Sequence, residues 1–196
     1  MERPAPADHP LHELILRRWS PRAFDPRPVE HAKLLQVFEA ARWAASSFNE
    51  QPWSFVYATR ADGEPYQRLF DCLVPGNQKW AGLAPVLCLS VARLTFARTG
   101  KRNRHAWHDV GLACANLWLQ AIALGLAAHF MAGFDAEKAA AAAGVPEGQE
   151  PVAMFVLGYP GDPGTLPEDL REREVAPRVR RPIAQSVFRG TCGVSI

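Results

Sequence analysis

Apolar side chains recur at helical spacing in several stretches of the chain. Within residues 29–45, Leu34, Phe38 and Ala41 fall on one side of a helix with 3.6 residues per turn. Pro28 precedes this stretch and suits the first turn of a helix, where no backbone N–H is needed. By the same reasoning, the pattern predicts helices over residues 11–19, 29–45, 108–124 and 136–143.

Shorter runs of β-branched, aromatic and other apolar residues predict strands over residues 53–58, 85–92 and 151–158, with a short strand or turn between Gly125 and Gly133. The pattern is poor from residue 59 to about residue 83. Residues 95–104 are basic and polar, which indicates a mobile excursion. Residues 162–196 are rich in proline and arginine and predict an extended C-terminal arm. We therefore expect residues 1–196 to form one α+β domain.

One apolar segment, residues 110–134, is long enough to cross a bilayer. Asn116 and Gln120 lie near its centre, four residues apart on one helical face, and His129 follows. A helix that is apolar on all sides can also be the buried central helix of a soluble domain. The composition, 48% hydrophobic and 21% charged, is ordinary for such a domain. We expect a buried helix and no membrane association.

Charge and cysteine content narrow the setting of the protein. The formal net charge of +2 is too small to indicate a nucleic-acid binder. The chain has 4 cysteines, and their spacing offers no CxxC pair or metal knuckle, which is typical of a reducing compartment. The N-terminal residues lack the pattern of an export signal. These features predict a cytoplasmic protein.

Two arginine clusters could bind an anion. If the chain is extended after the first helix, as the proline that follows Ser20 encourages, then Arg18, Ser20 and Arg22 point the same way. Forked guanidinium donors match the oxygens of a phosphate. Arg178 and Arg180 would likewise project together from the C-terminal arm. The alternative is that both clusters are solvated basic surface.

A polar segment at residues 46–53 alternates in a way that suggests a second contact. Ser47, Asn49 and Gln51 would share one face of an extended chain. Amides carry both donors and acceptors, which is what the pyrimidine edge of a flavin requires. The alternative is an ordinary turn between a helix and a strand, which serine and asparagine also favour.

Taken in order along nearly the whole chain, these motifs resemble those of the nitroreductase family, the FMN-dependent α+β oxidoreductases. Arg18-x-Ser20-x-Arg22 is similar to the N-terminal signature of the family, and AASSFNEQPW at residues 44–53 resembles its A-P-S-S-x-N-x-Q-P-W segment. The resembling stretches are residues 17–24, 44–53, 108–125, 142–160 and 180–183.

The resemblance implies a three-layer fold with a central, mostly antiparallel sheet flanked by helices. It also implies an intertwined homodimer with FMN at the interface, each arginine-rich arm wrapping the partner. NADH or NADPH would supply hydride to the flavin. The oxidised nicotinamide would then leave, and a small oxidised acceptor, such as a nitroaromatic, quinone or enone, would bind where it had been, which is ping-pong exchange.

The resemblance further implies a set of cofactor contacts and no metal. The implied contacts are Arg18, Ser20, Arg22, Arg178 and Arg180 for the phosphate and ribityl chain, Ser46, Ser47 and Asn49 along the ring, Asn77 at the pyrimidine side, and Ala132 and Gly133 beside the central nitrogen N5. In the family, part of the serine segment comes from the partner subunit, and a backbone N–H is directed at N5. No side chain is assigned as a general acid.

The chain departs from the family pattern at several positions. Ala45 stands where proline is usual, Trp19 where a small or polar residue is common, and Ala132 where the family often has a polar or acidic residue. The loop at residues 70–83 is short. These differences leave the substrate open.

Other hypotheses fit parts of the sequence. His105, His108, Asp109 and His129 could suggest a metal site, but no HExxH or comparable frame surrounds them. The glycines of residues 158–164 lack the GxGxxG spacing of a dinucleotide-binding fold and favour a plain turn, and no GxSxG elbow is present. A non-catalytic flavin-binding protein is the main alternative, because a flavin site does not prove turnover. Flavin-fragmenting, dehalogenating and dehydrogenating family members are further alternatives.

Overall fold

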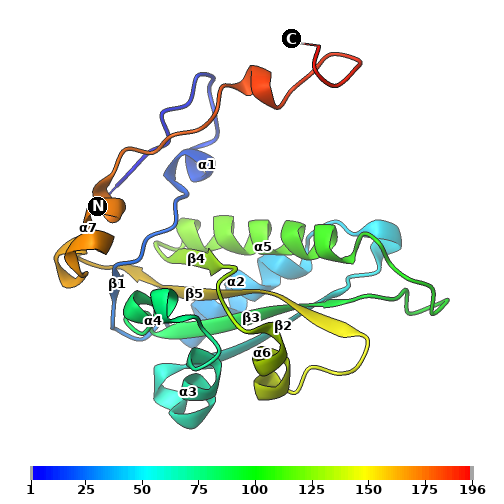
Figure 1. Ribbon diagram of the computed structural model, residues 1–196, viewed down its shortest axis with the longest axis horizontal. Helices are drawn as coiled ribbons and strands as arrows, with labels where there is room; N and C mark the ends of the chain where they lie inside the picture. Colours follow the sequence, from blue (N-terminus) through cyan, green and yellow to red (C-terminus); the bar gives the residue numbers. More distant parts are fainter. Residues whose placement is uncertain (1, 195–196) are drawn as a thin grey trace.

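An antiparallel sheet of five strands forms the centre of the structure, a computed structural model that describes residues 2–194 (Figure 1). Met1, Ser195 and Ile196, the ends of the predicted domain and arm, lie outside the described residues. The path of the sheet is β1-β5-β3-β2, and β4 pairs with β5. The strands are β1 (Phe24–Asp25), β2 (Trp53–Thr59), β3 (Val86–Arg93), β4 (Ala127–Met131) and β5 (Gln149–Pro160).

Helices cover both faces of the sheet, which gives three layers (Figure 1). One face packs against α2 (His31–Arg42) and α5 (Ala106–Ala123). The other face packs against three short helices, α3 (Glu64–Phe70), α4 (Pro75–Ala81) and α6 (Ala136–Ala143). Along β3, Val86 and Cys88 enter the first core while Leu87 and Leu89 enter the second. The strand is therefore apolar without interruption, because both of its faces are buried.

Stretches with strong periodicity form the predicted elements, and a stretch with weak periodicity contains two helices that the sequence does not predict. Helices are found within or close to the predicted ranges, and the predicted strands are present. The stretch without a clear pattern contains α3 and α4. Each has 7 residues and offers only a few inward side chains, such as Leu69 and Trp80, so helical periodicity has little room to show.

Strand β5 is longer than its pattern predicts and continues to Pro160, where a turn is expected from the sequence. Two glycines allow this. A Cβ atom at Gly158 would lie 2.6 Å from Cδ of Pro85, and one at Gly161 would lie 2.5 Å from the backbone carbon of Phe24. The missing side chains let β5 approach its neighbours closely enough to pair with β1.

Helix α5 is buried along one face only, contrary to the prediction of a helix buried on all sides. Ala113, Leu117 and Ala121 are fully buried in the core, whereas Trp107 and Leu112 are exposed. Within residues 2–194, the helices fall short of the length and apolar character that crossing a bilayer requires.

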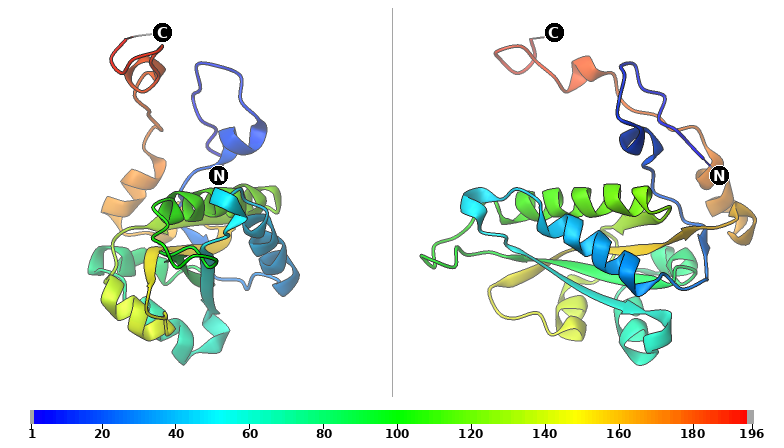
Figure 2. Two further views of the ribbon diagram at one scale, coloured as in Figure 1. Left: turned by 90° about the vertical axis from the view of Figure 1, so that its right-hand side faces the viewer. Right: turned by 180° about the vertical axis from the view of Figure 1, so that it is seen from behind.

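The two ends of the chain leave the layers together on the side of α5 (Figures 1 and 2). The N-terminal segment contains α1 (Glu13–Arg17). The C-terminal segment first forms a short turn and then α7 (Glu168–Val175), whose Leu170 and Glu174 are buried. The arm therefore leaves the body at Ala176 rather than at residue 162, and between that point and residue 194 only Ile183–Gln185 form a helical turn.

Candidate functional site

The structure brings three of the predicted phosphate residues together. Arg18 ends α1, and with Arg178, Arg180 and Arg181 it lines a hollow of about 440 Å³ between the N-terminal segment and the arm. The pKa of Arg18 is lowered, first by burial and then by the charges of Arg178 and Arg180. Guanidinium groups crowded in this way favour an anion among them.

Arg178, a predicted phosphate contact, donates to backbone carbonyls in this structure. Its Nη1 donates to the carbonyl oxygens of Arg3 and Leu16, and its Nη2 donates to the carbonyl oxygen of Arg18 at 2.7 Å. Arg3 in turn donates to the carbonyl oxygens of Glu174 and Ala176. The N-terminal segment and the arm therefore hold each other through arginine-to-carbonyl hydrogen bonds. Arg178 fixes the chain around Arg18 with both of its terminal nitrogens.

Arg22 lies against a buried carboxylate that the sequence does not reveal. Glu174 of α7 is 1% exposed and accepts hydrogen bonds from the backbone N–H groups of Arg22 and Ala23 at 2.9 to 3.1 Å. The guanidinium of Arg22 lies 3.9 Å from the same carboxylate. Glu174 therefore neutralises part of the charge of Arg22 and anchors the start of β1.

The chain between Ser20 and Arg22 is also held from the sheet. His129 of β4 packs on Trp80 at 4.4 Å between ring centroids, and its Nδ1–H donates to the carbonyl oxygen of Pro21 at 2.8 Å. Burial lowers the pKa of His129 to about 4; the hydrogen bond to Pro21 opposes this shift, and the charge of Arg22 adds to it. His129 is thus a neutral imidazole that fixes the backbone beside Ser20.

The segment 46–51 is not extended, so Ser47, Asn49 and Gln51 do not share one strand-like face. Residues Ser47–Asn49 form a 3-10 turn, and Phe48, Asn49 and Gln51 have φ values of 54°, 55° and 50°. Left-handed backbone in such residues costs free energy and persists only where surrounding contacts impose it. One such contact is local, since the Oγ of Ser46 accepts from the N–H of Gln51 at 3.0 Å.

Two carboxylates fasten this segment to the rest of the molecule. Asp109, buried in the first turn of α5, accepts from the backbone N–H of Ser47 at 2.9 Å, and its other oxygen lies 2.9 Å from Nδ1 of His108. Glu50 accepts from Nη2 of Arg93 and from the N–H of Ala97, each at 2.6 Å. The segment is therefore bonded to α5, β3 and the excursion that follows β3.

Asn77 and Gly133, predicted to lie near the same ring, are in direct contact. The Nδ2 of Asn77 donates to the carbonyl oxygen of Gly133 at 2.9 Å, and the backbone N–H of Val74 donates to the same oxygen at 3.1 Å. A Cβ atom at Gly133 would lie 2.8 Å from Nδ2 of Asn77. Glycine is thus required where the chain after β4 meets α4, and Ala132 is exposed next to it.

The arginine group and the serine segment lie at opposite ends of α5 within one chain (Figure 1). Asp109 holds the serine segment at the first turn of the helix, while Trp118 lies beneath Arg18. A separation of nine positions, from Asp109 to Trp118, corresponds to about 13 Å along a helix axis. One chain by itself therefore presents two separate halves of the predicted site.

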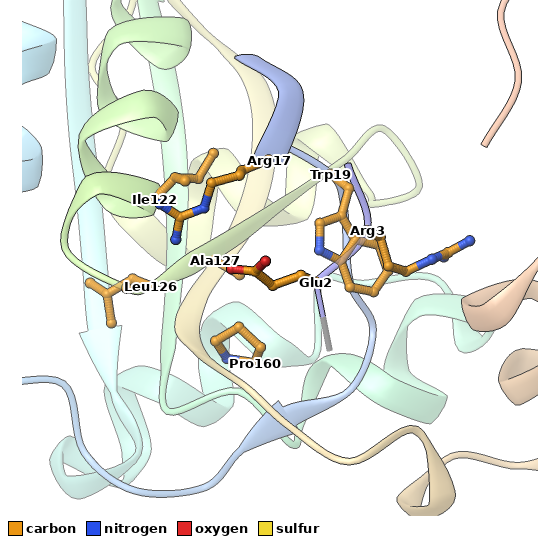
Figure 3. Close-up of a pocket in the computed structure, with 9 residues that line it drawn as sticks. Glu2, Arg3, Arg17, Trp19, Ile122, Leu126, Ala127 and Pro160 are labelled. Carbon is orange, nitrogen blue, oxygen red and sulfur yellow. The ribbon is translucent and has the colours of Figure 1, made fainter. Parts of the chain in front are cut away.

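A second hollow, of about 180 Å³, lies where the N-terminal segment meets the end of α5 and the start of β4. Figure 3 shows Glu2 and Arg17 there beside Ile122 and Leu126. The predicted cofactor residues are not among its lining residues. In the described part of the chain, His, Cys, Asp and Glu side chains form no group of three that could hold a metal ion.

Comparison with known proteins identifies the family. The model described as the nitroreductase family matches residues 15–81 and 65–159. An uncharacterised 15.4 kDa protein of Mycolicibacterium smegmatis is 46% identical over 133 residues, which cover 68% of this chain and 88% of that protein. An NADH dehydrogenase of Thermus thermophilus is 31% identical over 179 residues, which cover 76% of this chain and 86% of the relative.

Structural comparison agrees with the sequence. The crystal structure of an oxidoreductase containing FMN superposes with a TM-score of 0.91 and 37% identity, over 97% of each chain. A nitroreductase family protein of Streptococcus pneumoniae shares the fold, with a TM-score of 0.74 over 90% of this chain and 98% of that one, at 19% identity. The predicted α+β fold, an antiparallel sheet between helices, is confirmed, and the chain belongs to the nitroreductase family.

Proposed function

We propose that two copies of this chain bind FMN at their interface and use it to pass hydride from NADH or NADPH to a small oxidised acceptor by ping-pong exchange. The observation that carries the proposal is the group of Arg18, Arg178 and Arg180 around one hollow, the first two partly buried, whose mutual repulsion an anion would relieve. The relative that contains FMN matches this chain over 97% of its length.

The residues present fit a phosphorylated flavin. Arg18, Arg180 and Ser20 would hold the phosphate and ribityl chain, with Arg22 and Arg178 fixed beside them by Glu174 and by backbone carbonyls. FMN, when bound, would supply hydride transfer at N5. The predicted contacts along its ring are Ser46, Ser47, Asn49, Asn77, Ala132 and Gly133.

The protein contributes position and charge to this chemistry. Asn77 and Gly133 are locked together by their hydrogen bond, so the backbone at Ala132 and Gly133 is fixed where a donor to N5 is expected. The strained turn at Ser47 presents its polar groups in one conformation because Asp109 holds it. Arginine charge near the cofactor would stabilise the negative charge that develops on reduction.

Exposed apolar side chains support the proposed dimer. Trp43, which follows α2, is 73% exposed, and Trp107 and Leu112 of α5 are exposed as well. The arm adds Val179, which is 75% exposed, and Phe188. Exposed apolar surface of this extent marks an interface. A second copy would cover it and bring the serine segment of one chain toward the arginine group of the other.

Anaerobic stopped-flow measurement tests the proposed turnover. FMN-loaded protein mixed with NADH or NADPH is expected to lose its visible flavin absorbance and to regain it on addition of a quinone or nitroaromatic. If flavin stays bound but neither nucleotide reduces it, the protein is a non-catalytic flavin binder.

Analytical ultracentrifugation tests the proposed dimer. At micromolar concentration it is expected to give a dimer, and a flavin-loaded monomer would contradict the interface.

A further inference from the structure

The ring of Trp118, on α5, packs against the guanidinium of Arg18, an arginine of the proposed phosphate site. The guanidinium carbon of Arg18 is 4.7 Å from the centroid of the Trp118 ring. A cation at this distance from the face of an indole is attracted to it, more strongly where water is excluded. Arg18 is partly buried, so water screens its attraction to the indole less than it would at an exposed site.

The indole is itself braced against the sheet. Its ring centroid lies 5.0 Å from that of Phe130 on β4, and Phe130 stacks on Phe155 of β5 at 4.5 Å. Phe155 is fully buried in the core. The chain of aromatic contacts therefore runs from the sheet to Arg18, and it offers that guanidinium a rigid platform.

The indole N–H of Trp118 has no partner within one chain. Nε1 is buried, and no residue among 2–194 accepts a hydrogen bond from it. Trp118 does not line the hollow beside Arg18, so its N–H is not a contact of the anion. Its NMR resonance nevertheless lies next to the guanidinium of Arg18 and reports on the position of that group.

We propose that Trp118 is a positioning residue of an anion site: the face of its ring orients the guanidinium of Arg18 toward the hollow that Arg178 and Arg180 also line, where a phosphate monoester would bind. This inference rests on the proposed function where the ligand is FMN. Without that function, the same geometry still describes a site for a phosphate group.

The first test compares FMN with riboflavin, which lacks the phosphate. Trp118→Leu is expected to weaken FMN binding about 5- to 30-fold, the range of a desolvated cation–aromatic contact. Riboflavin affinity should change little. In an Arg18→Ala background, Trp118→Leu should no longer affect FMN affinity, since the two residues act as one unit. Equal weakening of FMN and riboflavin, or additive effects of the two substitutions, would overturn the proposal.

The second test needs no flavin. Trp118→Phe removes one indole N–H resonance and so assigns it in a proton–nitrogen NMR spectrum. Inorganic phosphate is expected to shift that resonance in the wild-type protein and not in Arg18→Ala. A resonance that responds to neither phosphate nor FMN overturns the inference. If phosphate shifts it and FMN does not bind, the anion site stands while the proposed function fails.

Discussion

The carboxylate of Glu174 should be the most sensitive single point in the link between the arm and the body. Glu174→Gln keeps the shape of the side chain and removes its charge. The carboxylate accepts from the N–H groups of Arg22 and Ala23 and lies 3.9 Å from the guanidinium of Arg22. Glu174 itself is 1% exposed. An amide oxygen in the position of Oε1 could still accept from both N–H groups, but the NH₂ group would then replace Oε2 and face the N–H and the guanidinium of Arg22.

The magnitude follows from these contacts. A hydrogen bond to a charged group contributes about 1.5–3 kcal/mol, and removing one partner of a buried ion pair costs about 3–5 kcal/mol. The amide retains part of the network, and the guanidinium of Arg22 can turn to solvent. We therefore expect Glu174→Gln to lower the free energy of unfolding by about 2–4 kcal/mol.

Urea denaturation at a fixed protomer concentration measures this effect, because the stability of a dimer depends on concentration. Glu172→Gln on the same helix is the matched control. Glu172 is exposed, so its substitution should change stability by less than about 0.5 kcal/mol. A Glu174→Gln variant as stable as this control would refute the assignment of Glu174 as the anchor of β1.

The site leads to three further predictions. Burial lowers the pKa of His129 to about 4, below its ordinary value of 6.5. The contribution of neutral His129 to stability is therefore complete above pH 6.5 and is lost as the pH falls toward 4. His129→Gln should flatten this part of a plot of urea midpoint against pH, and an unchanged slope would contradict the shift. Gly133→Ala places a Cβ atom 2.8 Å from Nδ2 of Asn77. This substitution should lower the free energy of unfolding by about 1–3 kcal/mol, as measured in thermal melts. A stability equal to that of the wild type would show that Asn77 can move aside without cost. Asp109→Asn weakens the hydrogen bond to the N–H of Ser47 and should speed hydrogen exchange at that amide, which mass spectrometry would detect; protection equal to wild type would show that other contacts suffice to hold the turn.

The parts of the fold that follow from local sequence are those with strong periodicity. The apolar stripe of α2 and the continuous apolar run of β3 specify their elements directly. Helices α3 and α4 are too short to show a period. The partial exposure of α5 could not be foreseen, because an apolar helix face reads the same whether a sheet or a second chain covers it.

The site shows the same division between local and distant causes. The motifs predict Arg18, Arg178 and Arg180 at one site, and the structure places these three side chains around one hollow. The left-handed turn at Phe48 and Asn49 is not predicted, since it depends on Asp109, 62 positions from Ser47 in sequence.

Glu174 gave no signal at all. It lies in a charged helix, and its partner Ala23, just before β1, is 151 residues away in sequence. The task of Arg178 was equally hidden, because a guanidinium that binds backbone carbonyls looks in sequence like one that binds phosphate. The local sequence therefore predicts where the arginines lie, whereas the hydrogen-bond partner of each depends on residues that are distant in sequence.

The most direct test of the central claim is the visible absorbance spectrum of purified protein after incubation with FMN and removal of free flavin, with the released ligand identified by mass. The account predicts bound FMN in the wild-type protein and in Arg68→Ala, which loses only an exposed pair with Glu64. It predicts affinity weakened by about 1.5–3 kcal/mol in Arg18→Ala. Colourless wild-type protein, or Arg18→Ala that retains FMN as tightly as wild type, would contradict it.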